Sequence, residues 1–590
     1  MEFFVQSQDG KFQRDRGRGT GGRFGFAAAA MLVIAGILLL LDRAGAPGRL
    51  VVALGPLCAL AALAVIGVAM RTMLVSQFYA AGRRVPVAYG GLGLAGLAMA
   101  LALPLLPQPV TLPRLAVLGG GLGGGLLVAA FVSGPLLRKS GAFSVAGLLG
   151  ARFPGLAFRL ASLALVVAIA GLVALAGLAL ANESLMLASG FARWPCAILL
   201  GLAVALLILP GGFSGVVWAS AAGACGLGGA LAISLGLAGA QHIPLALPLL
   251  AESAALQQAL AHLQDFGQPP GDPPLQGEAW FIYLFGFAVL APLLGLFAST
   301  ARASMAPRAG IIGIFWVLVL ATLLLASMVL ATHALDEDLV GRKPEQLPDI
   351  AYATSVRGLL LLCGKAVATP AAARAACAAQ PGFAGMLAAG DIAVSPLAIV
   401  STLAMVRDPP VAVGSLVLAG LVMAGLALAS AGLQTLASAL ADEGFYRLRD
   451  QAAVTSRRLA IARAAMLCAI AGAMAVLVLA APEARGMSGA ALALSAGLVA
   501  PLTALALWPL AQTRDALLGL AAGLLFALVR GPAVLAGYDD PGAVAISVAG
   551  ACLATGLFAS LFHAGRTRPR AFFRKLFSRS GEILPPDKGA

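Results

Sequence analysis

Stretches of about 20 consecutive apolar residues recur along almost the whole chain, and they constrain its fold more than any other feature. A stretch of this length crosses the hydrocarbon core of a bilayer as an α-helix. Of the 590 residues, 60% are hydrophobic and only 11% are charged, whereas soluble domains carry about 25% charged residues. The sequence therefore excludes a water-soluble enzyme, a disordered chain and a secreted disulfide scaffold, and it predicts an all-α polytopic membrane protein.

The apolar stretches divide the chain into about fourteen expected membrane-spanning helices. The first follows a charged tail, and we interpret it as a span because no convincing small-residue cleavage site accompanies it. An even number of crossings places both termini on one side of the membrane. The expected spans are residues 26–41, 50–70, 86–106, 114–137, 157–182, 195–210, 214–238, 279–300, 309–333, 410–437, 458–482, 488–511, 515–537 and 541–563.

The basic residues follow the positive-inside rule. The formal net charge is +14, and Lys and Arg gather in both terminal tails and in the short segments 71–84, 138–152, 302–308 and 447–458. All of these lie on one side of the expected topology, so both termini are expected in the cytoplasm. The basic segments lack the interleaved aromatic residues of a nucleic-acid-binding module. The expected partner is therefore the lipid bilayer, and the richness in Ala, Gly and Arg favours a bacterial inner membrane.

Two segments on the opposite side are long. Residues 239–278 form an outer loop, and residues 334–409 form a larger excursion with apolar pieces at 357–364 and 395–406. We interpret the second piece as a short re-entrant or interfacial helix, because an extra span would break the agreement of the charges. Cys363 and Cys377 both lie in the excursion. In an oxidising compartment they could pair, and two free thiols are an equally open alternative.

No catalytic or metal-binding constellation is present in the sequence. Gly91, Gly93 and Gly96 match G-x-G-x-x-G, but they lie inside an apolar span with no strand before them, so we assign them to helix packing. There is no Walker motif, no H-E-x-x-H and no C-x-x-C, and the four histidines are scattered. We therefore expect no enzyme activity, no cofactor and no metal site.

Polar residues inside an apolar span are costly and often mark a pathway. The expected span 410–437 is the most informative: Ser430 and Gln434 share one helical face with Ser438, just beyond it, and Thr435 lies beside them. Two interpretations stay open for this stripe. It can face a cavity that solute crosses, or it can form hydrogen bonds between helices.

Four segments resemble the sodium:solute symporter family, in particular its acetate and monocarboxylate branch with one extra N-terminal helix. Residues 78–91 read FYAAGRRVPVAYGG, similar to the family's F-Y-x-A-G-R-x-V-P signature. Residues 134–153 read GPLLRKSGAFSVAGLLGARF, similar to its P-x-L-R-K-F-G segment. Residues 209–224 read LPGGFSGVVWASAAGA and residues 437–450 read ASALADEGFYRLRD. The first of these two segments resembles the family's G-G-x-x-G-V-x-W-T turn, and the second resembles the segment at the foot of a late core helix.

The resemblance implies an inverted five-helix repeat of the LeuT-like kind, in which broken helices hold substrate and cation at mid-membrane. It also implies an organisation into core, peripheral helices and tails. The expected segments are a basic cytoplasmic tail at 1–25, two peripheral helices at 26–70, a first repeat at 86–238, the outer loop at 239–278, a second repeat at 279–511 that includes the excursion, two peripheral helices at 515–563, and a basic cytoplasmic tail at 564–590.

The chain departs from the family where the cation binds. By resemblance the cation-site positions fall on Gly96, Met99, Gly425, Leu428 and Ala429. The family has hydroxyls where Leu428 and Ala429 stand here, and neither residue offers a side-chain oxygen. A dehydrated Na⁺ would be poorly compensated at such a site. We therefore expect sodium binding to be weak or absent.

Two functions of different classes are compatible with this sequence. The first is a secondary transporter of a small solute, such as acetate or another monocarboxylate, in which Na⁺ coupling is weak or replaced by H⁺ coupling or facilitated diffusion. The second is a transport-dead symporter homologue that serves as a membrane sensor or assembly partner. The sequence does not identify a protein partner, the solute or the coupling ion.

Overall fold

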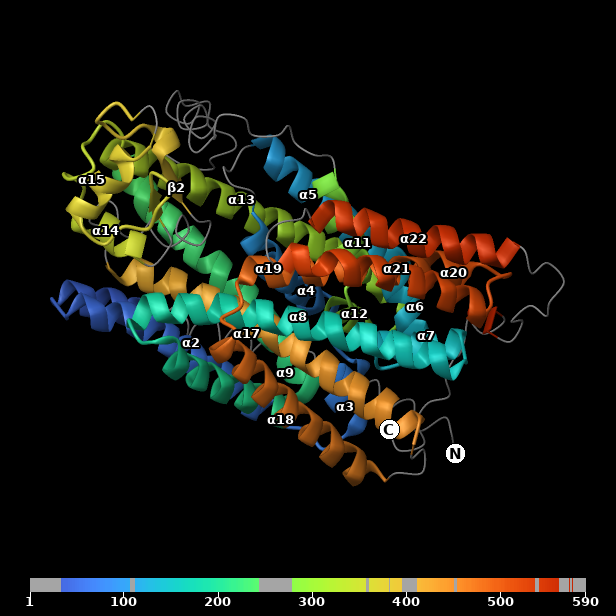
Figure 1. Cartoon of the computed structure of the whole chain (residues 1–590). Helices are drawn as coiled ribbons and strands as arrows, with labels where there is room; N and C mark the ends of the chain where they lie inside the picture. The colour runs from blue at the N-terminus through green and yellow to red at the C-terminus, as the bar shows by residue number, and fades with distance from the viewer. Residues whose placement is uncertain are drawn as a thin grey trace.

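The computed structural model describes residues 33–106, 112–242, 278–356, 360–380, 383–394, 411–449, 454–535, 541–561, 572–573 and 576. Most of these residues form helices packed side by side in one elongated bundle (Figure 1). Eleven described helices are long and apolar enough to cross a membrane, or twelve with one bent pair taken as a single span. The predicted fold class, an all-α polytopic membrane protein, is confirmed. The expected tail at 1–25, the piece at 395–406 and nearly all of the loop 239–278 and the tail 564–590 lie outside the described residues.

The count of spanning helices is lower than fourteen for two reasons. The first expected span, 26–41, is described only from residue 33, and a helical segment runs over residues 33–43. The expected spans 195–210 and 214–238 form one element, α9 (Arg193–His242), which is interrupted at Gly212 with φ 53° and ψ −143°.

Gly212 is the point where α9 folds back on itself. A Cβ atom on Gly215 would lie 2.7 Å from the carbonyl oxygen of Leu207, although eight residues of straight helix rise about 12 Å. The half before Gly212 contacts α18, because Arg463 donates to the Leu209 carbonyl. The half after Gly212 packs on α17, where a Cβ on Gly223 would lie 3.2 Å from Ala424 Cα. α9 therefore accounts for two crossings, as the sequence predicted.

In the first half of the chain, α4 (Val87–Ala102) is buried over almost its whole length, and it packs mainly against α9 and against α13 (Ala306–Leu339) of the second half. Its sequence is apolar on every side, and such a helix belongs in a core. The other elements of this half are α2 (Gly48–Ala69), α3 (Val75–Ala80), η1 (Ala81–Arg83), η2 (Leu103–Leu105), α5 (Leu112–Val128), the π-helical turn η3 (Ala129–Ser133), α6 (Gly134–Ser140), α7 (Val145–Arg152) and α8 (Leu156–Ser189).

In the second half of the chain, α17 (Val411–Ser438) continues into the π-helical segment η6 (Ala439–Arg447), and it packs mainly against α8, α9 and α2 of the first half. Before it, α11 (Glu278–Val289) and α12 (Ala291–Ala298) meet at a bend of 44° at Leu290. Pro292 causes this break, because proline has no N–H to donate back along a continuous helix. The remaining elements are η4 (Ala303–Met305), α13 (Ala306–Leu339), α18 (Thr455–Leu479), α19 (Ala484–Ser495), η7 (Ala496–Leu498), η8 (Ala500–Ala504), α20 (Leu505–Leu507), α21 (Thr513–Leu535) and α22 (Pro541–Leu561).

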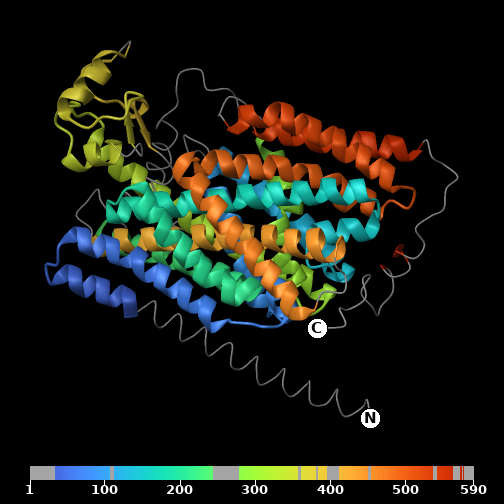
Figure 2. The ribbon, with the colours of Figure 1, turned by 60° about the horizontal axis from the view of Figure 1, so that its bottom comes forward.

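The excursion forms a small unit at one end of the bundle, while α7 lies at the other end (Figures 1 and 2). It contains α14 (Asp349–Val356), α15 (Pro370–Ala378), η5 (Ala389–Asp391) and an antiparallel pair of strands, β1 (Leu360–Leu362) and β2 (Ile392–Val394). Its own apolar core includes Leu362 and Leu387. A disulfide joins Cys363 to Cys377, which decides between the two alternatives that the sequence left open.

Close helix contacts around α17 depend on small residues. A Cβ on Gly177 of α8 would lie 2.5 Å from the carbonyl oxygen of Gly425, and a Cβ on Gly96 of α4 would lie 2.5 Å from the carbonyl oxygen of Ser220. Such distances leave no room for a side chain, so these backbones touch directly. Gly96 thus serves helix packing, as the sequence analysis proposed for the G-x-G-x-x-G match.

We predict that Gly212→Ala will destabilise the protein by more than about 2 kcal/mol, because residues strained at positive φ cost about 1–3 kcal/mol and the new Cβ would lie 2.6 Å from the Phe78 carbonyl oxygen. Urea or thermal unfolding of the purified protein in one detergent measures the change. The matched control is Gly472→Ala on α18, whose Cβ meets nothing within 4 Å. This control should be neutral or slightly stabilising. Equal stability of the two variants would contradict the fold-back at Gly212.

Candidate functional site

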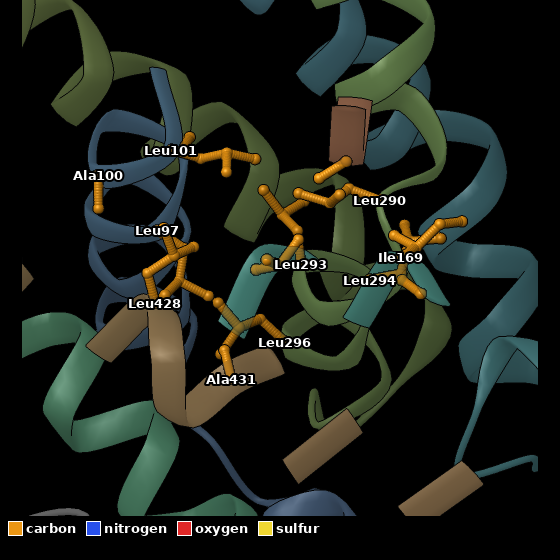
Figure 3. Close-up of a cluster of buried hydrophobic side chains, with 14 of the residues drawn as sticks. Leu97, Ala100, Leu101, Ile169, Leu290, Leu293, Leu294, Leu296, Leu428 and Ala431 are labelled. Atoms are coloured by element: carbon orange, nitrogen blue, oxygen red, sulfur yellow. The ribbon is translucent and has the colours of Figure 1, made fainter. Parts of the chain in front are cut away.

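The centre of the bundle is where α4, α8, α12 and α17 approach one another, and apolar side chains fill it (Figure 3). Leu97 of α4 lies beside Leu428 of α17 in the close-up, and Leu293 of α12 lies near Leu101. All four side chains are at most 1% exposed. The residues labelled in this cluster are Leu97, Ala100, Leu101, Ile169, Leu290, Leu293, Leu294, Leu296, Leu428 and Ala431.

The cation-site positions implied by the resemblance lie in or beside this apolar centre. Leu428 belongs to the cluster itself, whereas Gly425 and Ala429 face α8, where Gly177 packs against both. Met99 is 3% exposed and Ala429 is fully buried. None of these five positions supplies a side-chain oxygen, so an ion here would depend on backbone carbonyls alone.

The backbone carbonyls of α4 are not free to bind a cation. α4 has no break at its centre, in contrast to the unwound helix that the resemblance implied, and the Leu103 N–H donates to the Met99 carbonyl. Gly96 lies in the same unbroken stretch. Its apolar sequence offers no side chain that could replace a lost backbone hydrogen bond, and an unwound turn would leave unsatisfied groups in the core. The corresponding helix of the second half is broken, at Leu290 between α11 and α12.

The polar stripe of α17 is fully enclosed. The Ser430 hydroxyl donates to the Ala427 carbonyl, Thr435 donates to Ala431, and Ser438 donates to Thr435. All three bonds stay within the helix, so these hydroxyls are satisfied by their own backbone in this conformation. The three residues are at most 7% exposed, and their place on a solute pathway stays a prediction.

Gln434 differs from its three neighbours because it reaches another element. Its Nε2 donates to the carbonyl oxygen of Phe78, at 2.9 Å, and so ties α17 to α3. Its Oε1 is buried without a hydrogen-bond partner. A buried amide with one unused acceptor is a polar group that a solute, water or a rearranged helix can engage. Of the four residues in the stripe, Gln434 is the strongest candidate for a functional role.

An ion-pair cluster at the foot of α17 was not identified in the sequence analysis. Asp442, 1% exposed, accepts from Arg458 at 2.9 Å and from Arg447 at 3.2 Å. Glu443 pairs with Arg447 at 3.0 Å, and Arg458 lies 3.6 Å from the centroid of the Tyr446 ring. The sequence signal for this cluster is the pair of adjacent acids, Asp442 and Glu443, that directly follows the apolar span of α17. The cluster closes the bundle between η6 and α18.

Arginines at the same end of the bundle donate to backbone carbonyls at and just after the C-terminal ends of helices. Arg138 donates to Thr300 and Ala301 just after α12. Arg152 donates to Ala506, Trp508 and Ala511 around the end of α20. Burial lowers the pKa of Arg152 to about 10, so it keeps its charge at neutral pH. Arg138 and Arg152 belong to the basic segments from which the sequence analysis predicted the orientation in the membrane. They also cap helix C-termini, where the helix dipole favours a positive charge.

The candidate site is therefore a buried apolar centre, and the ion-pair cluster around Asp442 lies at one end of the bundle. No group of three or more His, Cys, Asp or Glu residues in the described part of the chain could hold a metal ion. Beyond this centre along α17 and η6, Gln434 bonds to α3 and Asp442 bonds to α18.

We predict that Arg458→Gln will cost about 3–5 kcal/mol of stability, because it leaves Asp442 as a buried charge short of a partner. The matched control is Arg374→Gln in the excursion, whose partner Glu345 forms an exposed pair. An exposed pair contributes about 0–1 kcal/mol, so this control should leave the unfolding midpoint nearly unchanged. Unfolding of both variants in the same detergent tests the contrast. Equal midpoints would show that the buried cluster does not hold the fold together.

Comparison with protein-family models found no match, and comparison with curated proteins found none. Among solved structures, the chain is similar to the substrate-bound outward-open state of a Na⁺-coupled sialic acid symporter. The TM-score is 0.60 and the identity 15%, over 88% of this chain and 99% of that one. It also matches Mhp1, a nucleobase-cation-symport-1 family transporter, at TM-score 0.41 and 14% identity over 87% and 96% of the two chains. A manganese transporter of Eremococcus coleocola matches at TM-score 0.41 and 14% identity over 82% and 94%.

The likeness to the sialic acid symporter extends over nearly the full length of that protein, and at 15% identity it is a likeness of fold. It agrees with the topology described above, in which α4 and α12, the second half of the broken pair, lie in the core beside α17. The chain therefore has the LeuT-like fold that its sequence predicted.

Proposed function

We propose that this protein is a secondary membrane transporter that moves a small solute by alternating access. The observation that carries the proposal is the fold shared with a Na⁺-coupled sialic acid symporter over 88% of the chain. The four sequence segments that resemble the acetate and monocarboxylate branch of the sodium:solute symporters add a substrate class. The proposed solute is a small organic anion, acetate or another monocarboxylate.

Sodium coupling in this proposal is weak or lost. Leu428 and Ala429 replace oxygen-bearing side chains, and Met99 keeps its carbonyl within α4. Removing water from Na⁺ is costly without compensating oxygens. The transport cycle would then run on a proton gradient or on the solute gradient alone.

The proposed location is a bacterial inner membrane with both termini in the cytoplasm. The helix-capping arginines lie at one end of the bundle, as the positive-inside rule expects of the cytoplasmic side. The excursion with its Cys363–Cys377 disulfide lies at the other end. Disulfides persist in oxidising compartments such as the periplasm, which supports placing that end outside.

The packed centre also supports a second candidate, a transport-dead homologue that acts as a membrane sensor or assembly partner. Leu97, Leu293 and Leu428 are buried in the apolar cluster at the middle of the fold. A polar solute entering there would lose its hydration and find no hydrogen-bonding partner on these three side chains.

Uptake into proteoliposomes distinguishes the two functions. Labelled acetate and a panel of small carboxylates are offered under an inward sodium gradient, an inward proton gradient, and no gradient. We expect uptake that is driven by protons or is independent of both ions. Uptake driven by sodium would overturn the proposed loss of the cation site. Absence of uptake for the whole panel, together with a stable partner protein recovered from native membranes, would establish the second candidate.

We predict that Gln434→Leu will lower the uptake rate about ten-fold or more, the effect of losing a hydrogen bond of about 1.4 kcal/mol in the transition state of the cycle. The matched control is Ser547→Ala on the peripheral helix α22, whose hydroxyl bonds only within its own helix. Size-exclusion profiles and unfolding midpoints verify that both variants fold. Unchanged uptake in a folded Gln434→Leu variant would remove this residue from the mechanism.

A further inference from the structure

A cavity of about 280 Å³ lies away from the bundle centre, between α2 and the core. Its walls come from the helical segment 33–43, α2, α9 and α17. None of its lining residues belongs to the polar stripe, to the central leucine cluster or to the ion-pair cluster. The cavity is therefore a separate feature that the proposed transport mechanism does not use.

The cavity exists because α2 is held against the core at two places and carries small side chains between them. At one place the Gly55 N–H donates to the Ser415 hydroxyl of α17, at 3.1 Å. At the other, Gly67 packs directly on the backbone of Leu206 and Leu207 in α9. Between these contacts α2 presents Cys58, Ala59 and Ala62 to the cavity. Such short side chains cannot bridge the gap to α9 and α17.

The lining has the chemistry of a hydrocarbon pocket. Every lining residue is Ala, Gly, Ile, Leu, Met or Cys, so no charged, amide or hydroxyl side chain faces the space. An empty apolar cavity loses dispersion contacts along its walls. A cavity of about 150 Å³ lined in this way already accommodates benzene, so the space here holds several methylene groups. Water is a poor occupant, since it would find no polar partners.

The position of the cavity in the bilayer points to the occupant. α2 has 22 residues, about 33 Å of helix, which matches a hydrocarbon core of about 30 Å. Its lining residues from Gly55 to Ala62 lie about 10–21 Å from its first residue, at the depth where the acyl chains of one leaflet end. α17 supplies Leu416 and Met423, from its end nearer the excursion.

The cavity is continuous with the surface that lipid covers. Gly229 lines it and is exposed. The neighbouring outer faces carry Ile37, Leu57 and Val65, which are 48%, 38% and 67% exposed. In a membrane-spanning helix such side chains face acyl chains, and the same chains can reach the cavity beside Gly229.

We propose that this cavity is a binding site for the hydrocarbon chain of a membrane lipid from the leaflet at the excursion end. The chain lies between α2 and the core helices α9 and α17, and it supplies the packing that the small side chains leave out. The lipid headgroup remains at the membrane surface.

The test is photolabelling of the full-length protein in phosphatidylethanolamine and phosphatidylglycerol vesicles doped with a phospholipid that carries a diazirine near the end of one acyl chain. Peptide mass spectrometry locates the labels. We expect labels concentrated on residues 55–62 and 225–230, above the level on the lipid-facing side of α18. Labelling of the cavity no stronger than that of α18 would overturn the proposal.

Gly229→Leu fills the cavity without disturbing the backbone, because a Cβ at this position meets nothing within 4 Å. Labelling of residues 55–62 should be lost in this variant and retained in the control Gly472→Leu, which adds the same side chain to exposed α18. Retained labelling in a folded Gly229→Leu protein would also overturn the proposal.

A measurement on the unmutated protein keeps the test decisive if Gly229→Leu does not fold. Cys58 lines the cavity, whereas Cys468 is exposed on α18. After delipidation in detergent, added phospholipid should protect Cys58 from a lipophilic maleimide and leave Cys468 reactive. Equal protection of the two thiols would mean that lipid covers the whole surface without occupying the cavity.

Discussion

Hydrocarbon offers no partner for an N–H, a carbonyl or a hydroxyl, and this constraint explains most of the local choices in the structure. α4 stays helical through the centre because its apolar side chains could not replace lost backbone bonds. The hydroxyls of Ser430 and Thr435 bond back to their own helix. The chain departs from helical geometry at Gly212 and at the bend before Pro292, where the residue type permits or forces it. At the bundle end, Arg138 and Arg152 supply donors to helix carbonyls.

The same constraint limits what the centre can bind. A fold that carries ions and solutes does so with oxygens exposed at broken helices, and here the first of the two core helices is unbroken. The second, α11–α12, keeps its bend but presents Leu290 and Leu293 to the centre. The LeuT-like fold is thus combined with a centre whose surface is hydrocarbon. The two functions proposed above differ in whether this centre opens to a solute.

Helices in this protein are held together by contacts of different strength in different regions. Around α17 the backbones of Gly177, Gly425 and Ala429 touch, which gives the core a close and stiff packing. At the foot of α17 the contact is electrostatic and depends on Asp442 and its arginines. Along α2 it is looser, with a cavity between two points of attachment.

The sequence alone determined the membrane character, the fold class and the location of nearly every span, because the cost of placing a residue in hydrocarbon is local and adds along the chain. It also placed the glycines of α4 in helix packing, but it left open whether Cys363 and Cys377 pair. The tertiary structure decided what depends on residues far apart in sequence. It showed that Cys363 and Cys377 form a disulfide, that Gln434 reaches Phe78, that Asp442 pairs with Arg458 and that a cavity lies behind α2. Hydropathy carries no information on these contacts, since each is fixed by which helix faces which and at what distance.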